Sequence, residues 1–163
     1  MKAQDRLTVI AMSDLFQDIP WAVVHQLGEV AVEEVSAGVI VREQGETMTR
    51  IRLLVEGKMA VSAVVNGLEV IVEMLEPGAW TNLSALTDSK VSGSRVRAVR
   101  DSVLLSLDAD RVKQVLIKEP EAGVRVMIRV AQSIEDRYRA LAEAMRRNLE
   151  REWESLETRS QTA

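Results

Sequence analysis

The fold is decided by residues 54–75, which read LVEGKMAVSAVVNGLEVIVEML. Apolar and polar residues alternate on both sides of Asn66-Gly67, and this period of two predicts strands that each have one buried face. Asn66 and Gly67 both tolerate positive φ angles, which a tight hairpin turn requires. We therefore expect two antiparallel strands joined by this turn. Their predicted core-facing residues are Met59, Val61 and Ala63 in the first strand and Val70, Val72 and Met74 in the second.

The alternation extends beyond this hairpin, over residues 30–107. Val96 and Ala98 alternate with Arg95 and Arg97, so the apolar pair is expected to face the core and the arginines the solvent. Glycines punctuate the region at intervals of 7, 12, 10 and 11 residues, at Gly38, Gly45, Gly57, Gly67 and Gly78. Turns at that interval are typical of an all-β barrel or sandwich.

Helical spacing precedes the strands, over residues 13–29, where the recurring apolar residues are Leu15, Phe16, Ile19, Val23, Val24 and Leu27. This spacing predicts a helix. Ser13 or Asp14 can cap its first turn by accepting a bond from a backbone N–H group. Pro20 can open its main part, because the N–H group that proline lacks has no helical partner in a first turn.

Helical spacing also follows the strands, from Asp108 onward. Asp108 or Asp110 can cap a short helix around residues 111–116, and Pro120 can open a long one. Apolar residues in the long helix recur at alternating steps of four and three, which is the period of a coiled coil. They are Met127, Ala131, Ile134, Tyr138, Leu141 and Met145, followed less regularly by Leu149.

The length of this helix indicates a partner. About 35 residues span roughly 50 Å at about 1.5 Å per residue, which is more than one small barrel can cover. We therefore predict a homodimer through the long helix, with a different partner protein as the alternative. The sequence then divides into a barrel domain at residues 13–118, a coiled-coil-like helix at 119–157 and a frayed tail at 158–163.

Composition narrows the function classes. Of the 163 residues 47% are hydrophobic, and 21 Lys and Arg stand against 25 Asp and Glu, which gives a net charge of -4. Such a chain can bury a core, but its charge disfavours generic nucleic-acid binding. There is no Cys, and the one His, His25, lies on a segment that indicates a surface position. Thiolate and polyhistidine sites are thereby excluded within one chain, so we expect no metal and no cofactor.

The sequence also bears on location. It contains no apolar run long enough for a membrane span, and its first residues do not have the pattern of a signal peptide. We therefore expect a cytoplasmic protein that does not enter a membrane.

The order of helix, glycine-punctuated barrel, short helix and long helix resembles the cyclic-nucleotide-binding domain family. The resemblance is strongest to the effector domains of catabolite-activator and fumarate–nitrate-regulator transcription factors. It rests on five segments in order: Leu15-Phe16, GVIVREQGE at 38–46, LVEGKMAV at 54–61, LEPG at 75–78, and VRAV at 96–99 before VLLSLD at 103–108. It implies a mainly β fold, a jelly-roll barrel with flanking helices and a long C-terminal dimerisation helix.

In that family the ligand is held by a phosphate-binding cassette, which reads Gly-Glu-Leu followed about ten residues later by Arg-Ser or Arg-Thr and Ala. Backbone amides at the start of a short helix and the Arg bind the phosphate, and the Glu binds the ribose. Here Thr81, Asn82 and Ser92 stand at the Gly, Glu and Arg positions, and a slip of one residue would put Leu83 at the Glu position. Both charged anchors are missing from this segment. Losing a charge-assisted bond to a buried phosphate costs roughly 1.5–3 kcal/mol, so tight cyclic AMP or cyclic GMP binding by the usual mode is not expected.

The resemblance still locates a pocket, degenerate in its cassette. Its predicted ligand-binding residues are Trp80, Asn82, Ser84, Ser92, Ser94, Arg95, Arg137 and Tyr138. Arg95 or Arg97 could swing inward to replace the missing guanidinium, although the strand alternation directs both to solvent. Trp80 could stack on a planar ligand or fill the mouth of an empty pocket. Arg137 and Tyr138 stand near the long-helix positions that touch the nucleotide base in the family.

Two functions follow. The first is a non-enzymatic regulatory module that senses a small ligand and signals through the dimerising helix; the second is a docking protein with a decayed pocket. A cupin-like enzyme is not expected, because the histidine triad and any nucleophile motif are missing. A third reading is a fragment of a transcription regulator. In the family a helix-turn-helix needs about 60–80 residues after the long helix, which this sequence does not contain, so we expect no direct DNA binding by this chain.

Overall fold

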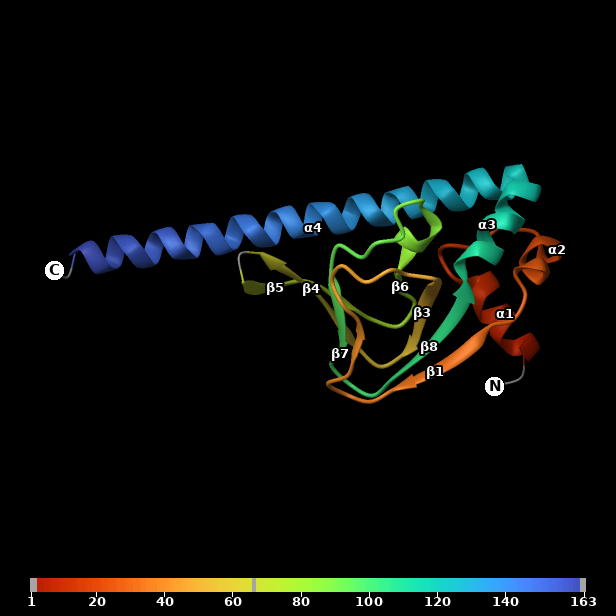
Figure 1. Ribbon diagram of the computed structural model, residues 1–163, viewed down its shortest axis with the longest axis horizontal. Helices are drawn as coiled ribbons and strands as arrows, with labels where there is room; N and C mark the ends of the chain where they lie inside the picture. Colours follow the sequence, from red (N-terminus) through yellow and green to blue (C-terminus); the bar gives the residue numbers. More distant parts are fainter. Residues whose placement is uncertain (1–2, 66, 162–163) are drawn as a thin grey trace.

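Two four-stranded antiparallel sheets form the barrel in the computed structural model, which describes residues 3–65 and 67–161. One sheet has the strand order β1-β8-β3-β6 and the other β2-β7-β4-β5. Short helices gather at one end of the barrel, while α4 crosses its side and extends past the β4–β5 hairpin (Figure 1). The predicted jelly-roll fold with flanking helices and a long C-terminal helix is confirmed.

The elements follow one another in the predicted order. The strands are β1 (Ala31–Val35), β2 (Ile40–Arg42), β3 (Arg50–Glu56), β4 (Met59–Val65), β5 (Leu68–Leu75), β6 (Trp80–Thr81), β7 (Arg95–Ala98) and β8 (Ser102–Asp108). The helices are α1 (Ala3–Met12), α2 (Trp21–Val24), α3 (Ala109–Lys118) and α4 (Pro120–Gln161), with 3-10 turns η1 (His25–Leu27) and η2 (Leu83–Leu86).

The hairpin that decides the fold is present, with one change of register. β4 and β5 pair antiparallel, and Gly67 has a φ of +80°, as a tight turn requires; Asn66 lies outside the described residues. Val61 pairs with Glu73 but Ser62 pairs with Ile71, so β5 carries one extra residue. A bulge of this kind moves every following side chain to the other face.

The bulge corrects one predicted core residue. Met74 is exposed and Leu75 is buried in its place, whereas Met59, Val61, Ala63 and Val70 are buried as expected. The shift also turns Glu73 onto the same face as Val61, which is the face that α4 covers. This placement of a carboxylate matters for the site described below.

The barrel core follows the predicted alternation elsewhere. On β7, Val96 and Ala98 are buried and Arg97 is exposed. A first apolar cluster fills the space between the sheets: Leu54, Met59, Val61, Leu75, Val96, Ala98 and Leu104. A second, larger cluster joins the outer face of the β1-β8-β3-β6 sheet to the helices, with Phe16, Val24, Ile51, Leu105 and Val126 among its members.

The N-terminal segment differs from the prediction. A continuous helix over residues 13–29 is wrong: residues 13–19 form turns, in which Asp18 has a φ of +61°, and only the short α2 and η1 follow. Leu15, Phe16 and Ile19 are nevertheless buried, so their helical spacing reflects separate insertions of turns into the core. The helix α1 precedes these turns. The Ser13 hydroxyl donates to the Ile10 carbonyl at the C-terminal end of α1, so Ser13 does not cap the start of a helix as predicted. Pro20 immediately precedes α2, as predicted. His25 is exposed.

The C-terminal helices begin where the sequence predicts. The Asp108 carboxylate accepts from the Arg111 amide at 2.8 Å and caps α3, and Pro120 is the first residue of α4. Gly123 permits the close crossing of the two helices, because a Cβ there would collide with the Leu116 carbonyl oxygen. α4 continues through Gln161 and so extends past residue 157, the predicted end of the long helix; the fraying of the tail stays a prediction. Residues 162 and 163 lie outside the described part.

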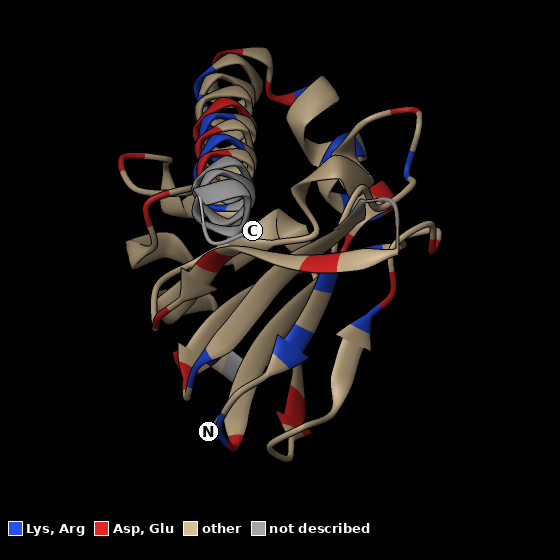
Figure 2. Cartoon of the chain, turned by 90° about the vertical axis from the view of Figure 1, so that its left-hand side faces the viewer, with Lys and Arg blue, Asp and Glu red and all other residues tan. Residues whose placement is uncertain are grey.

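The outer face of α4 is charged. Figure 2, which looks along the helix, shows acidic and basic residues alternating along it. Several form pairs one turn apart, such as Arg139 with Glu135 and Arg146 with Glu143. These exposed pairs suit a solvated face, while Ile134, Arg137 and Leu141 face the barrel.

Candidate functional site

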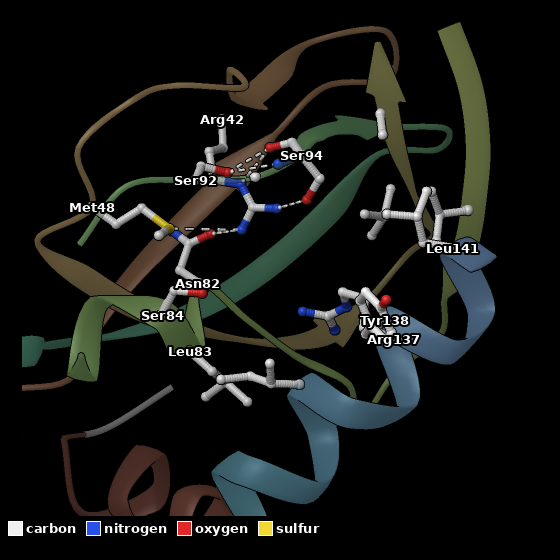
Figure 3. A pocket seen from close by; sticks show the side chains of 15 residues that line it. Arg42, Met48, Asn82, Leu83, Ser84, Ser92, Ser94, Arg137, Tyr138 and Leu141 are labelled. Carbon is white, nitrogen blue, oxygen red and sulfur yellow. Dashed lines mark hydrogen bonds between the residues drawn. The ribbon is translucent and has the colours of Figure 1, made fainter. Parts of the chain in front are cut away.

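A cavity of about 190 Å³ lies between the barrel and the middle of α4 (Figure 3). Its polar wall comes from β2 and from the segments around η2 and before β7: Arg42, Asn82, Ser84, Ser92 and Ser94. Its apolar wall consists of Met48, Val61, Ala63, Val72 and Leu83. α4 supplies the remaining wall of the cavity with Ile134, Arg137, Tyr138 and Leu141. The barrel and the long helix therefore share one cavity.

Arg42 is the central polar group of this cavity. Its side chain extends from the end of β2 and is buried, with 5% of its surface exposed. Its Nε donates to the Ser94 carbonyl at 3.1 Å and its Nη2 to the Ser94 hydroxyl at 2.8 Å. Its Nη1 donates to the Thr81 hydroxyl at 3.1 Å and to the Asn82 Oδ1 at 2.6 Å. All of these acceptors are uncharged, as Figure 3 shows for Asn82 and Ser94.

Arg42 is a buried charge without a charged partner. Burial lowers the pKa of the Arg42 guanidinium to about 10, and the positive charges of Arg137 and Arg52 add to this effect, while Glu46 opposes it. The group therefore still carries its proton at neutral pH. Within residues 3–65 and 67–161, no carboxylate forms an ion pair with it. A buried charge of this kind is costly unless an anion compensates it.

Arg42 was not placed in the pocket from the sequence, whereas the inference that the cassette segment lacks both charged anchors stands. The cassette positions do hold Thr81, Asn82 and Ser92, but Arg42 from another strand occupies the site. No pattern in the neighbouring sequence indicated that Arg42 enters the pocket. Arg42 lies in the segment GVIVREQGE at 38–46, which was used only for the resemblance to the family. An irregularity in the pairing of β2 with β7, between Ile40 and Arg42, turns Arg42 into the barrel.

Six of the eight predicted ligand-binding residues meet at the cavity: Asn82, Ser84, Ser92, Ser94, Arg137 and Tyr138. Asn82 has a left-handed backbone conformation, with a φ of +64°, and its buried side chain faces Arg42. The Ser92 hydroxyl donates to the Ser94 carbonyl at 2.6 Å and so fixes the acceptor of Arg42 Nε. Tyr138 is 73% exposed and lies at the mouth.

Arg95 and Trp80 do not line this cavity. Arg95 donates to Glu43 at 2.8 Å and to Glu69 at 3.3 Å on the outer side of the sheet, so it does not swing inward. Trp80 is buried against Phe16, with ring centroids 5.7 Å apart, and lines a separate groove beside the N-terminal segment. Trp80 therefore fills the core where the N-terminal turns meet the barrel.

Arg137 connects α4 to the barrel. Its Nε lies 2.9 Å from the Glu73 carboxylate on β5, and its Nη2 donates to the Trp80 carbonyl at 3.2 Å. The β5 bulge makes this ion pair possible, because it turns Glu73 toward the helix. In contrast to Arg42, Arg137 thus has a carboxylate as its partner.

The predicted dimer stripe divides into two groups. Ile134, Tyr138 and Leu141 line the cavity, although each retains some exposed surface. Met127, Ala131, Met145 and Leu149 do not line it and are exposed. The homodimer stays a prediction, and the structure adds that its seam would run beside the cavity.

In the part of the chain that is described, no group of three or more His, Cys, Asp and Glu side chains is arranged to hold a metal ion. Nor does this part contain a helix whose length and apolarity would suit a membrane crossing.

These features define a jelly-roll domain with a cavity between its barrel and a C-terminal helix. Residues 32–119, more than half of the chain, match the family described as Cyclic nucleotide-binding domain. The chain belongs to this family, and the resemblance stated from the sequence is confirmed. A comparison with curated proteins yields no match.

Several solved structures are similar in fold to this chain. The sensor domain of the transcriptional regulator DNR from Pseudomonas aeruginosa is 15% identical, with a TM-score of 0.70 over 83% of this chain and 93% of that one. A cyclic nucleotide-binding domain from Methylobacillus flagellatus is 20% identical, with a TM-score of 0.69 over 91% and 83%. The Thermus thermophilus Catabolite Activator Protein is 20% identical, with a TM-score of 0.65 over 78% of this chain and 61% of that one. At these identities the likeness establishes the fold alone.

Proposed function

We propose that this chain is a non-enzymatic, cytoplasmic regulatory domain that binds a small ligand between its barrel and α4 and signals through α4. The observation that carries the proposal is the shared cavity: Arg42 and Asn82 form one wall and Ile134, Arg137 and Leu141 form the other. A ligand there touches both parts of the domain at once. If it binds one arrangement of α4 more tightly than another, it shifts the population toward that arrangement.

The exposed surface of α4 supplies a route for the signal. Val124, Met127, Ile128 and Leu149 are apolar and exposed, and they continue on both sides of the cavity segment. We propose that they pair with α4 of a second copy. Because the cavity residues lie in the same helix, a change in how α4 sits on the barrel would change the angle between the paired helices.

A labelling experiment tests the proposal directly. The chain has no Cys, so Arg97→Cys on β7 together with Arg139→Cys on α4 gives two unique spin-label sites. Both arginines are exposed and lie outside the cavity. Pulsed electron resonance would measure the distance between labels with cyclic mononucleotides, cyclic dinucleotides and small metabolites. The same compounds would be tested in thermal melting, where a specific ligand raises the melting temperature.

We expect at least one compound to raise the melting temperature and to change the distance distribution. If no compound does either, the sensor proposal is wrong. The remaining reading is a docking protein, which is supported by the neutral acceptors that already hold Arg42 in place.

A third reading is also compatible with the comparisons. The chain spans 61% of the Thermus thermophilus Catabolite Activator Protein that it matches, so it could be the sensor part of a longer regulator. The length of the protein in its native cells distinguishes this reading from the other two.

A further inference from the structure

We infer that the ligand of this cavity is a small organic monoanion, an acid with an apolar body, anchored by Arg42. This inference rests on the proposed sensor function and names its ligand class. Three independent features lead to it: the charge balance of the cavity, the unused hydrogen-bond donors in it, and the size and character of its walls.

One negative charge would balance the charges of the side chains that line the cavity. Two guanidinium groups border the cavity. Arg137 is offset by Glu73 at 2.9 Å, whereas Arg42 is held by neutral acceptors only, the oxygens of Ser94, Thr81 and Asn82 and the sulfur of Met48. One uncompensated positive charge remains in a largely buried site, where it attracts an anion far more strongly than it would in water. A monoanion leaves the site neutral, and a dianion would replace one unpaired charge with another.

Both residues with unused donors line the cavity. A guanidinium has five N–H groups, and four of those on Arg42 are accounted for by Ser94, Thr81 and Asn82. One N–H on Nη2 is left, and the Ser94 hydroxyl that accepts from Nη2 can still donate its own proton. Across the cavity, Arg137 uses Nε for Glu73 and Nη2 for the Trp80 carbonyl. Figure 3 shows Arg42 and Arg137 on opposite sides of the opening. A carboxylate between them would accept charge-assisted bonds from both.

The walls favour a small ligand with an apolar body. A volume of about 190 Å³ falls below the range of roughly 300–1,000 Å³ that is usual for drug-sized ligands. Next to the polar corner, the remaining surface is apolar and comes from Val61, Ala63, Val72, Ile134 and Leu141. A nucleotide would need polar partners for its ribose hydroxyls, and the side chain in the position to bind them, Asn82, already uses its Oδ1 to accept from Arg42.

Isothermal titration calorimetry of the full chain tests the inference with matched acid and amide probes. Benzoate and hexanoate carry the charge, and benzamide and hexanamide have nearly the same shape without it. Cyclic AMP is the third probe. We expect both acids to bind and their amides to bind at least about ten-fold more weakly, because a charge-assisted bond is lost. This comparison uses the unmodified chain and does not depend on any variant being folded.

Two variants and a control locate the anchor. Arg42→Met removes the positive charge, and Asn82→Glu supplies a carboxylate to the same guanidinium, so both should weaken acid binding by at least about ten-fold. Asn82→Glu keeps Arg42 in place, so a loss there does not depend on the effect of losing Arg42. Arg97→Gln changes an exposed arginine on the outer face of β7 and should leave the affinity within about two-fold.

The outcomes separate this inference from the function on which it rests. If the amides bind as well as the acids, or if both variants bind the acids like the unmodified chain, the anion inference is wrong and ligand sensing stands. If only cyclic AMP or another compound of the sensor panel binds, the anion inference is likewise wrong and ligand sensing stands. If no compound of either panel binds, both proposals fall.

Discussion

Arg137→Met is the change that most directly tests how α4 is held on the barrel. Methionine keeps the aliphatic stem and suits a helix, but it removes the ion pair with Glu73 and the hydrogen bond to the Trp80 carbonyl. The side chains of the pair are 20% and 36% exposed, so solvent screens the attraction and it contributes roughly 0.5–1 kcal/mol. The bond to the carbonyl adds roughly 0.5–1.5 kcal/mol.

We therefore expect Arg137→Met to lower the free energy of unfolding by roughly 1–2.5 kcal/mol, which corresponds to about 2–10 °C in melting temperature for a chain of this length. Urea unfolding of Arg137→Met, Glu73→Gln and the double variant gives the coupling energy of the pair. Arg139→Met is the matched control, because the partners of Arg139 on the same helix are exposed, and it should cost under about 0.5 kcal/mol. Equal effects of the two arginine variants, or strictly additive effects in the cycle, would refute the reasoning.

Three further changes probe other parts of the fold. Gly123→Ala should lower the urea midpoint, because its Cβ would collide with the Leu116 carbonyl; an unchanged midpoint would show that α3 and α4 separate at no cost. Lys90→Met should raise the pKa of Asp110, which the Lys90 ammonium now lowers by a hydrogen bond and by its charge, and a carboxyl NMR titration measures this. Because the stabilisation from a lowered carboxyl pKa is present above the ordinary pKa and is lost as the pH falls through the lowered one, the variant should also lose less stability in acid. Leu149→Asp should yield monomers in light scattering by placing two carboxylates in the predicted seam, and an unchanged mass would contradict the coiled coil.

The barrel could be predicted because its signals are local. The alternation of apolar and polar residues arises because one face of each strand is buried, and it can be recognised within a few residues. A turn glycine is likewise required by the backbone of its own turn. The capping of α3 by Asp108 and the start of α4 at Pro120 are equally local. Each of these features depends on the backbone needs of the residues next to it, and the sequence shows those residues directly.

The errors arise where a distant segment decides the local structure. A helix-like spacing over residues 13–29 was produced by turns whose apolar residues all enter one core. Leu75 is buried in place of the predicted Met74 because β5 contains one extra residue, and alternation alone cannot locate such a bulge. The position of Arg42 inside the barrel depends on how β2 pairs with β7, which lies about fifty residues further along the chain.

The structure gives a common meaning to two departures from the family's cassette. Asn82 accepts a bond from Arg42 at 2.6 Å but brings no charge, and Ser92 holds the Ser94 carbonyl that accepts from the same guanidinium. The positive charge has thus been supplied from β2, while the acid that would stand beside it has been replaced by an amide. A glutamate at position 82 would neutralise Arg42 inside the barrel, whereas asparagine leaves that charge to be met from outside. The fold is that of the family, and in our proposal the net charge of the cavity decides which ligands it can hold.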